Sequence, residues 1–387
     1  MRRILITPAI EALAKRYANG MMKGKNLTAK PKDNLKTLKS VLISKSTTFV
    51  FKKKKVSTKT GRKKSIFRGN EVPEYAAYIE DIIKRYPVLN NLHPREFDNL
   101  KKTMESNHPD VDLSVVVRIG AKGKTMSFAN HIVKAMDYDG VRDNVFREYM
   151  QDPAIGIKAC VYCNAQYALT TLLEPALTLA KIRKITGRGR RPNPHPARYG
   201  ATYELDHNLP KDEYPYLCTN FYNLQPCCGP CNRHKNDNAV NFSVYYWDKE
   251  DPKPLHFELG AKDIIKFRQK NKCEGLKPIL KSSTADTSLV DAFNKAFSID
   301  AVYSLHTDEV QELLWRHKIY SATGVDALRA SFSHLFADGF DADRFILGTY
   351  ISEADAHKRP LTIMKQDIIK QIKDEEARGS KIGGYGK

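Results

Sequence analysis

Two Cys-x-x-Cys pairs limit what this 387-residue chain can fold into more than any other feature of its sequence. The pairs are Cys160 with Cys163 and Cys228 with Cys231. Each pair fits one tight turn, and two such turns can present four thiolates to one tetrahedral Zn²⁺. Four sulfur ligands leave no open coordination position, so we expect a structural zinc that takes no part in chemistry. The 64 residues between the pairs are long for a simple zinc ribbon, which predicts a second site between them.

The other three cysteines, Cys218, Cys227 and Cys273, are expected not to bind the metal. Seven cysteines in all is an odd number, and without a signal peptide it argues against a disulfide framework. The first apolar run, Ile4 to Ile6, is too short for a signal sequence, and no run of about 18 apolar residues predicts a membrane helix. We therefore expect a cytoplasmic protein.

The stretch from Tyr203 to His207 alternates like a strand and ends in an Asp-His pair. Adjacent strand residues point to opposite faces, so Asp206 and His207 are expected to have separate roles. One can hold a metal while the other transfers a proton.

Two further segments are predicted to complete this unit. Residues 221–224 read as the returning strand, and residues 231–235 as the start of a helix. If the start of the helix packs against the end of the first strand, Asp206 and Asn232 supply two oxygen ligands for a hard cation.

Three sequence segments, CVYCN, ELDHNLP and NLQPCCGPCNRHK, resemble the HNH endonucleases of the ββα-metal class, in the zinc-clipped branch with four cysteines. The resemblance covers about residues 155–240. It implies hydrolysis of phosphodiester bonds in DNA with one divalent ion, Mg²⁺ or Mn²⁺.

Residue roles follow from motif position. The resemblance implies that His207 is the general base that activates water, and that Asp206 and Asn232 bind the catalytic Mg²⁺. It implies that Asn223 ties down the loop and orients the base. The third motif letter is Asn232 where the family name has His, and His234 is a rival ligand.

The expected fold class is α+β, with a central ββα-metal core over residues 155–240 that carries a basic insertion at 181–196. A helical scaffold over residues 69–154 is predicted from apolar stripes, the first of which runs from Tyr75 to Tyr86 and is stopped by Pro87. Residues 241–387 are predicted to be mainly helical, with helices at 262–270, 288–297, 308–320, 325–336 and 361–373. A strand-like run is expected at 167–172.

Positive charge is concentrated in the first 68 residues. They hold 20 Lys or Arg and two acids, while the whole chain has a net charge of +20. Such clustering favours phosphate binding, because each bound phosphate releases a counterion; the alternatives are a solvated flexible arm or a basic edge strand at 47–56. The insertion at 181–196 has six basic residues and no acid, is broken by Gly and Pro, and is predicted to be an exposed loop beside the motif. The predicted nucleic-acid contacts are Lys52, Lys53, Lys54, Lys55, Arg62, Lys63, Lys64, Arg188, Arg190, Arg191 and Lys235.

A wider resemblance, carried by GIKACVYCN, ELDHNLPKDEYPYL and FYNLQPCC, is to HNH proteins of bacterial anti-phage defence, such as the HNH subunit of Septu-type systems that works beside an ATPase. Restriction and mobile-element nucleases share the motif. The alternative function is a catalytically inactive, zinc-stabilised nucleic-acid-binding module. Such a binder needs the cysteines but not Asp206, His207 and Asn232, which favours the enzyme. A Cys-x-x-Cys redox protein is disfavoured because neither pair has a βαβ context.

Overall fold

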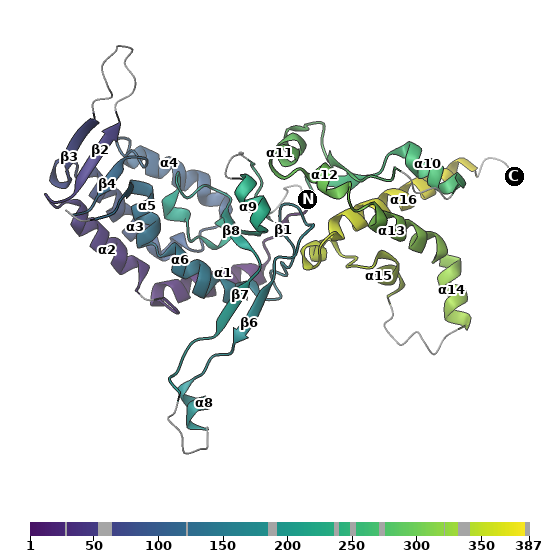
Figure 1. Cartoon of the computed structure of the whole chain (residues 1–387), viewed down its shortest axis with the longest axis horizontal. Helices are drawn as coiled ribbons and strands as arrows, with labels where there is room; N and C mark the ends of the chain where they lie inside the picture. The colour runs from purple at the N-terminus through teal and green to yellow at the C-terminus, as the bar shows by residue number, and fades with distance from the viewer. Residues whose placement is uncertain are drawn as a thin grey trace, which may run out of the picture.

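A computed structural model describes residues 1–27, 29–52, 64–120, 123–184, 192–235, 240–247, 253–270, 275–320, 322–331 and 341–383. Helices hold 53% and strands 14%, which confirms the α+β class. The molecule is elongated, with the N-terminal helices and a sheet at one end and the C-terminal helices at the other (Figure 1). Strand β8 and helix α9, which belong to the Asp-His motif and the second cysteine pair, lie between these two lobes (Figure 1).

Where the structure describes them, the first 68 residues form two amphipathic helices and three strands. Helix α1 (Pro8–Lys23) begins where the Thr7 hydroxyl accepts a hydrogen bond from Ile10 N, and it ends at Gly24, whose φ of +67° suits glycine. Helix α2 is Pro31–Leu42. Both helices bury an apolar face in the main core. The sequence reasoning, which interpreted this region as a concentration of positive charge, missed these helices, because their lysines lie between the buried positions.

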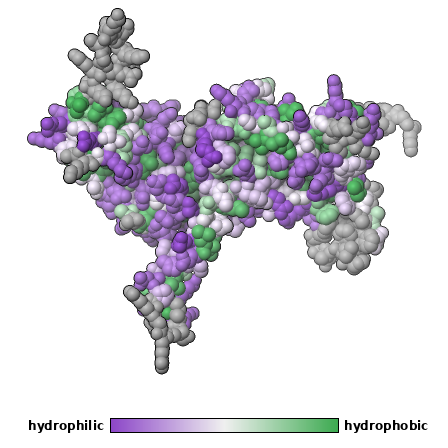
Figure 2. Space-filling view, viewed as in Figure 1, coloured by the Kyte–Doolittle hydropathy of each residue, from purple (hydrophilic) through white to green (hydrophobic). Residues whose placement is uncertain are grey.

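A four-stranded antiparallel sheet follows, in the order β3-β2-β4-β5. Its strands are β2 (Thr48–Lys52), β3 (Lys64–Arg68), β4 (Val116–Arg118) and β5 (Thr125–Ser127). Strand β2 pairs with β3 on one side and β4 on the other, so the alternative of an edge strand at 47–56 is wrong. The two edge strands are β3 and β5, and Ile66 and Phe67 are exposed on β3. Figure 2 shows a hydrophobic patch at this end of the molecule.

The helical scaffold contains α3 (Glu74–Leu89), α4 (Phe97–Asn107) and α5 (Phe128–Ala135). Pro87 does not stop α3, which continues to Leu89. The proline removes the N–H that would bond to the carbonyl of Ile83, and the helix ends two residues later. The scaffold ends in three short helical pieces in succession, α6 (Tyr138–Gly140), a π-helical turn (Val141–Phe146) and α7 (Arg147–Met150).

An antiparallel ribbon of β6 (Thr170–Glu174) and β7 (Arg198–Ala201) projects from the body and carries helix α8 (Leu179–Arg183) near its far end (Figure 1). The predicted strand at 167–172 thus begins three residues later. The basic insertion is helical where it starts, because the Thr178 side chain accepts a hydrogen bond from Lys181 N and begins α8. The prediction of a loop is wrong for that part, and residues 185–191 lie outside the described residues.

The C-terminal lobe is mainly helical, as predicted, with a two-stranded ribbon that the sequence pattern did not indicate. The ribbon pairs β11 (Leu255–Glu258) with β12 (Ile279–Ser282). Strand β1 (Ile4–Leu5) pairs with β10 (Tyr245–Tyr246), so the start of the chain lies against this part of the molecule. No helix within the described ranges is long and apolar enough to cross a membrane. The helices are α10 (Ala261–Lys270), α11 (Ser288–Phe297), α12 (Ile299–Tyr303), α13 (Thr307–Ile319), α14 (Ala322–Ser331), α15 (Ala342–Leu347) and α16 (Thr362–Gly383).

Candidate metal centre and catalytic site

The predicted strands and helix occur in the expected order. Strand β8 (Glu204–His207) pairs antiparallel with β9 (Leu224–Cys227), and helix α9 (Gly229–Lys235) follows at once and packs on β8. The returning strand was predicted over 221–224 and instead begins at Leu224. The side chain of Asn220 accepts hydrogen bonds from Tyr222 N at 2.9 Å and Asn223 N at 3.1 Å, which holds residues 221–223 in a 3₁₀ turn.

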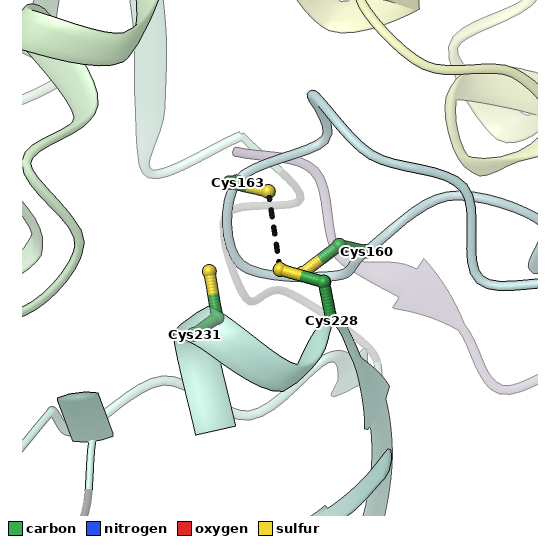
Figure 3. Close-up of side chains that lie close together, drawn as sticks. All are labelled: Cys160, Cys163, Cys228 and Cys231. Carbon is green, nitrogen blue, oxygen red and sulfur yellow. Dashed lines mark hydrogen bonds between the residues drawn. The ribbon is translucent and has the colours of Figure 1, made fainter. Parts of the chain in front are cut away.

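The four predicted cysteines come together. The Sγ atoms of Cys160, Cys163, Cys228 and Cys231 all lie within 4.8 Å of one another, and all four residues are buried. Two of the thiols come from one loop and two from the start of α9 (Figure 3). Cys163 Sγ lies 3.9 Å from Cys228 Sγ. A tetrahedral zinc with Zn–S bonds of about 2.3 Å places its sulfurs about 3.8 Å apart, so the cluster can hold a zinc ion.

The neighbouring thiols shift one another's pKa in opposite directions, raising that of Cys163 and Cys231 and lowering that of Cys228. Hydrogen bonds from Cys160, Cys163 and Cys231 hold the pKa of the Cys228 thiol below its usual range. The thiolate is the form that binds zinc. By contrast, burial raises the pKa of Cys218 to about 12, and Cys227 Sγ lies 3.7 Å from the Glu204 carbonyl oxygen. Cys273 lies outside the described residues.

The loop of the first cysteine pair is fastened to the C-terminal lobe through Asn164, a residue that the sequence reasoning missed. Its φ is +50°, which Asn tolerates. The buried side chain accepts a hydrogen bond from Ile363 N at 3.2 Å, in the first turn of α16, and donates one to Ala356 O at 3.2 Å. The only sequence signal was the Asn that directly follows Cys163.

His207 is buried at the end of β8 with one ring nitrogen engaged. Its Nε2 lies 2.9 Å from the carbonyl oxygen of Cys218, and its ring packs on Tyr138 with centroids 4.8 Å apart. A carbonyl only accepts, so Nε2 carries the hydrogen and Nδ1 has the lone pair. Among the described residues, the ring makes this one hydrogen bond, through Nε2, and none through Nδ1. Burial lowers the pKa of His207 to about 4, which leaves the imidazole neutral at pH 7.

Asp206 points to the other face of β8. Its Oδ2 accepts hydrogen bonds from the Tyr162 hydroxyl and from Lys235 Nζ. Lys235 Nζ also donates to His207 O at 2.8 Å, so this predicted nucleic-acid contact lies on the candidate metal ligand. Oδ1 of Asp206 has no partner within the described part of the chain, and the side chain is 12% exposed.

Asn232 and Glu204 form a second pair at the start of α9. Asn232 Nδ2 donates to Glu204 Oε2 at 2.6 Å, and no hydrogen bond joins Asn232 to Asp206. Glu204 and Asp206 are alternate residues of one strand and share a face. The rival ligand His234 belongs to no group of candidate metal ligands in the part of the chain that the structure describes.

Asn223 fixes the loop between β8 and β9. Its buried side chain accepts a hydrogen bond from Leu209 N at 2.7 Å and donates to Leu209 O at 3.1 Å and Leu217 O at 3.0 Å. The next residue after Leu217 is Cys218, whose carbonyl holds His207. Asn223 therefore restrains the loop that supplies this carbonyl.

Most of the predicted basic contacts fall where the structure gives no side-chain detail. Lys52 and Lys64 are opposite each other at the ends of β2 and β3. The residues that lie outside the described ranges are Lys53, Lys54, Lys55, Arg62, Lys63, Arg188, Arg190 and Arg191.

Comparison of the chain with protein-family models, with curated proteins and with solved structures finds no match.

Proposed function

We propose that this chain is a metal-dependent endonuclease of the HNH type that hydrolyses phosphodiester bonds in DNA. One observation carries the proposal: His207, on β8, has a neutral imidazole whose Nδ1 is a hydrogen-bond acceptor without a partner among the described residues. The neighbouring residue Asp206 has a carboxylate oxygen, Oδ1, that also has no hydrogen-bond partner among the described residues, since both of its contacts are to Oδ2. The residue proposed as proton acceptor and the residue proposed as cation ligand are therefore neighbours at the end of β8.

His207 would take the proton from the attacking water. A general base must be unprotonated and must present a lone pair at the right nitrogen. Burial keeps the imidazole neutral, and the Cys218 carbonyl keeps the hydrogen on Nε2. Asn223 supports this arrangement by restraining the loop before Cys218.

Asp206 and Asn232 would hold the catalytic Mg²⁺ or Mn²⁺. Carboxylate and amide oxygens are the ligands that such hard cations prefer. Asp206 lies on β8 and Asn232 on α9, and these two elements pack against each other. When bound, the cation would stabilise the charge that develops on the phosphate oxygens. Lys235 Nζ supplies a single positive charge at the same carboxylate.

The four cysteines would hold a structural Zn²⁺ that joins the loop before β6 to the start of α9. A closed thiolate site adds folding free energy and leaves no position for substrate.

Plasmid cleavage tests the proposal. Wild-type protein is incubated with supercoiled DNA and Mg²⁺ or Mn²⁺, beside His207→Ala. His131 gives a matched control, because it is also buried and its Nε2 lies 3.1 Å from a backbone carbonyl, that of Val117, in the N-terminal sheet. Cutting by wild type and His131→Ala, with none by His207→Ala, supports the nuclease. Equal cutting by His207→Ala contradicts it.

The rival function is a zinc-stabilised nucleic-acid-binding module without catalysis. It is favoured by one observation, that Lys235 pairs with Asp206 while Glu204 binds Asn232, so both candidate ligands have protein partners. In that case DNA would bind, no divalent ion would support cutting, and Asp206→Asn would leave DNA affinity unchanged.

We place this activity in bacterial anti-phage defence or restriction, on the resemblance alone. An ATPase subunit is the partner that this role implies. Co-purification from the native host, with and without phage infection, tests for it: an ATPase recovered in stoichiometric amount supports the role, and a chain that is recovered alone under both conditions contradicts it.

A further inference from the structure

Tyr162 lies between the two cysteines of the first zinc turn, and its side chain points into the candidate catalytic site. The residue is fully buried, and its ring stacks on Phe297 of the C-terminal lobe with centroids 4.8 Å apart and planes 19° apart. Its hydroxyl donates to Asp206 Oδ2. A residue held by the thiolate turn therefore contacts the carboxylate of the second metal site.

The direction of this hydrogen bond is fixed by a backbone group. Val244 N can only donate, so the Gln225 oxygen that lies 2.7 Å from it must be the acceptor. The Gln225 Nε2 then donates to the Tyr162 hydroxyl oxygen at 3.0 Å and to Phe242 O at 3.1 Å. The Tyr162 hydroxyl consequently uses its own hydrogen for Asp206.

This network sets how Asp206 presents its two oxygens. Gln225 lies opposite Asp206 in the β8–β9 register, so the network runs across one strand pair. The Tyr162 hydroxyl donates to Oδ2 of Asp206, and Oδ1 has no hydrogen-bond partner among the described residues. The other contact to Oδ2 comes from Lys235, on a long flexible stem, whereas the tyrosine ring is held in place by packing on Phe297.

We infer that Tyr162 is a positioning residue through which the zinc turn orients the Asp206 carboxylate for the catalytic cation. This inference rests on the proposed function, because it takes Asp206 as a cation ligand. The zinc turn then has a second task besides stabilising the fold. Residues that hydrogen-bond a metal ligand commonly set metal affinity in this way.

Tyr162→Phe removes the hydroxyl alone. Asp206 keeps its contact with Lys235, and Gln225 Nε2 keeps its hydrogen bond to the Phe242 carbonyl, so neither residue loses its last hydrogen bond and the fold should persist. We expect Mn²⁺ binding at Asp206, followed by electron paramagnetic resonance without DNA, to weaken roughly 10- to 100-fold. Zinc content and melting temperature should match wild type. Unchanged Mn²⁺ affinity would overturn the inference.

Substitutions at two other buried tyrosines are controls that distinguish a positioning role of Tyr162 from a general loosening of the zinc turn. Tyr245→Phe removes a buried hydroxyl that has no hydrogen-bond partner in the part of the chain that the structure describes. Tyr303→Phe removes a hydroxyl that donates to Cys163 O at 2.7 Å, so it loosens the same zinc turn without touching a contact to Asp206. Both should bind Mn²⁺ as wild type does. Equal weakening by Tyr303→Phe and Tyr162→Phe would mean that any loosening of the turn suffices, which overturns the inference.

If Tyr162→Phe loses its zinc, a second variant, Gln225→Glu, still tests the inference. Gln225→Glu still accepts from Val244 N but offers the tyrosine an acceptor, which would draw the hydroxyl away from Asp206. The added negative charge alone would strengthen cation binding, so weaker Mn²⁺ binding supports the inference and unchanged or tighter binding overturns it. Asp206→Asn completes the set: if it binds Mn²⁺ like wild type, the proposed function fails together with the inference.

Discussion

The Nε2 of His207 lies 2.9 Å from the carbonyl oxygen of Cys218, and this contact determines which ring nitrogen can accept a proton. The carbonyl belongs to the loop between β8 and β9, so the chemistry assigned to His207 depends on the position of that loop. Asn223, whose role was expected from motif position, makes three hydrogen bonds that restrain the same loop.

Asn223→Ala is therefore expected to reduce cleavage without altering the zinc site. The substitution leaves Leu209 N and Leu217 O without their side-chain partner and should destabilise the fold by about 1–3 kcal/mol. Single-turnover cleavage and urea unfolding measure the two effects. Asn208→Ala is the control, because that side chain makes no hydrogen bond among the described residues. Full activity in Asn223→Ala would contradict the proposal that Asn223 supports the catalytic site.

Lys235→Gln should tighten Mn²⁺ binding. Lys235 Nζ contacts Asp206 Oδ2, and a divalent cation at this carboxylate would be repelled by the ammonium group. A charge of +1 and a charge of +2 a few ångströms apart repel by about 2 kcal/mol in a water-like medium, so removing the ammonium charge should raise the Mn²⁺ affinity about 30-fold. Calorimetric titration with Mn²⁺ measures it. Arg233→Gln removes the same charge from an exposed position on the same helix, and a gain as large in that variant would contradict the local explanation.

Acid should destabilise the fold through His357. Burial lowers the pKa of this histidine to about 4, and its Nε2 lies 3.0 Å from Arg2 O. The unfolded chain binds a proton below about pH 6.5, but the folded chain does so only below about 4. Stability from this group is complete above pH 6.5 and is lost as the pH falls toward 4. From pH 7 to 5 its share is about 2 kcal/mol.

Urea unfolding of wild type and His357→Gln at pH 7 and 5 measures this share. Glutamine can still donate to Arg2 O but does not titrate. The variant should lose less stability than wild type on acidification, by about 2 kcal/mol. An equal loss in both proteins would mean that His357 is already protonated in the fold or stays neutral in both states.

The basic residues of the first segment need point substitutions, because deleting residues 1–68 would also remove α1 and α2 and their core residue Tyr17. Replacing Lys53, Lys54, Lys55, Arg62 and Lys63 with Gln should weaken DNA binding and flatten its dependence on salt. Binding measured from low to moderate salt tests this. An unchanged slope would show that these residues contact no phosphate.

Local patterns predicted the parts of this protein that depend on nearby residues. The spacing of two cysteine pairs was enough to name four side chains that the fold brings together, and the stripe at 288–297 gives helix α11 with the same bounds. Helices α1 and α2 were missed because lysines between their buried positions hid the period.

Contacts between distant segments could not be predicted in this way. Tyr162 meets Asp206 across 44 positions, and Asn164 meets Ile363 across 199, so no local spacing contains either contact. The pairing of Lys235 with Asp206 and of Asn232 with Glu204 depends on how α9 packs on β8. Motif position alone names these residues without giving their partners.

The central claim is that this chain has two metal sites of different chemistry, a closed thiolate site for structure and an open oxygen site for cutting. Zinc content, melting temperature and plasmid cleavage measured together on Cys163→Ser and Asp206→Asn test it most directly. We predict that Cys163→Ser loses zinc and melts at a lower temperature, whereas Asp206→Asn keeps its zinc and its fold but no longer cuts DNA. Unchanged zinc in the first variant, or wild-type cutting by the second, would contradict the account.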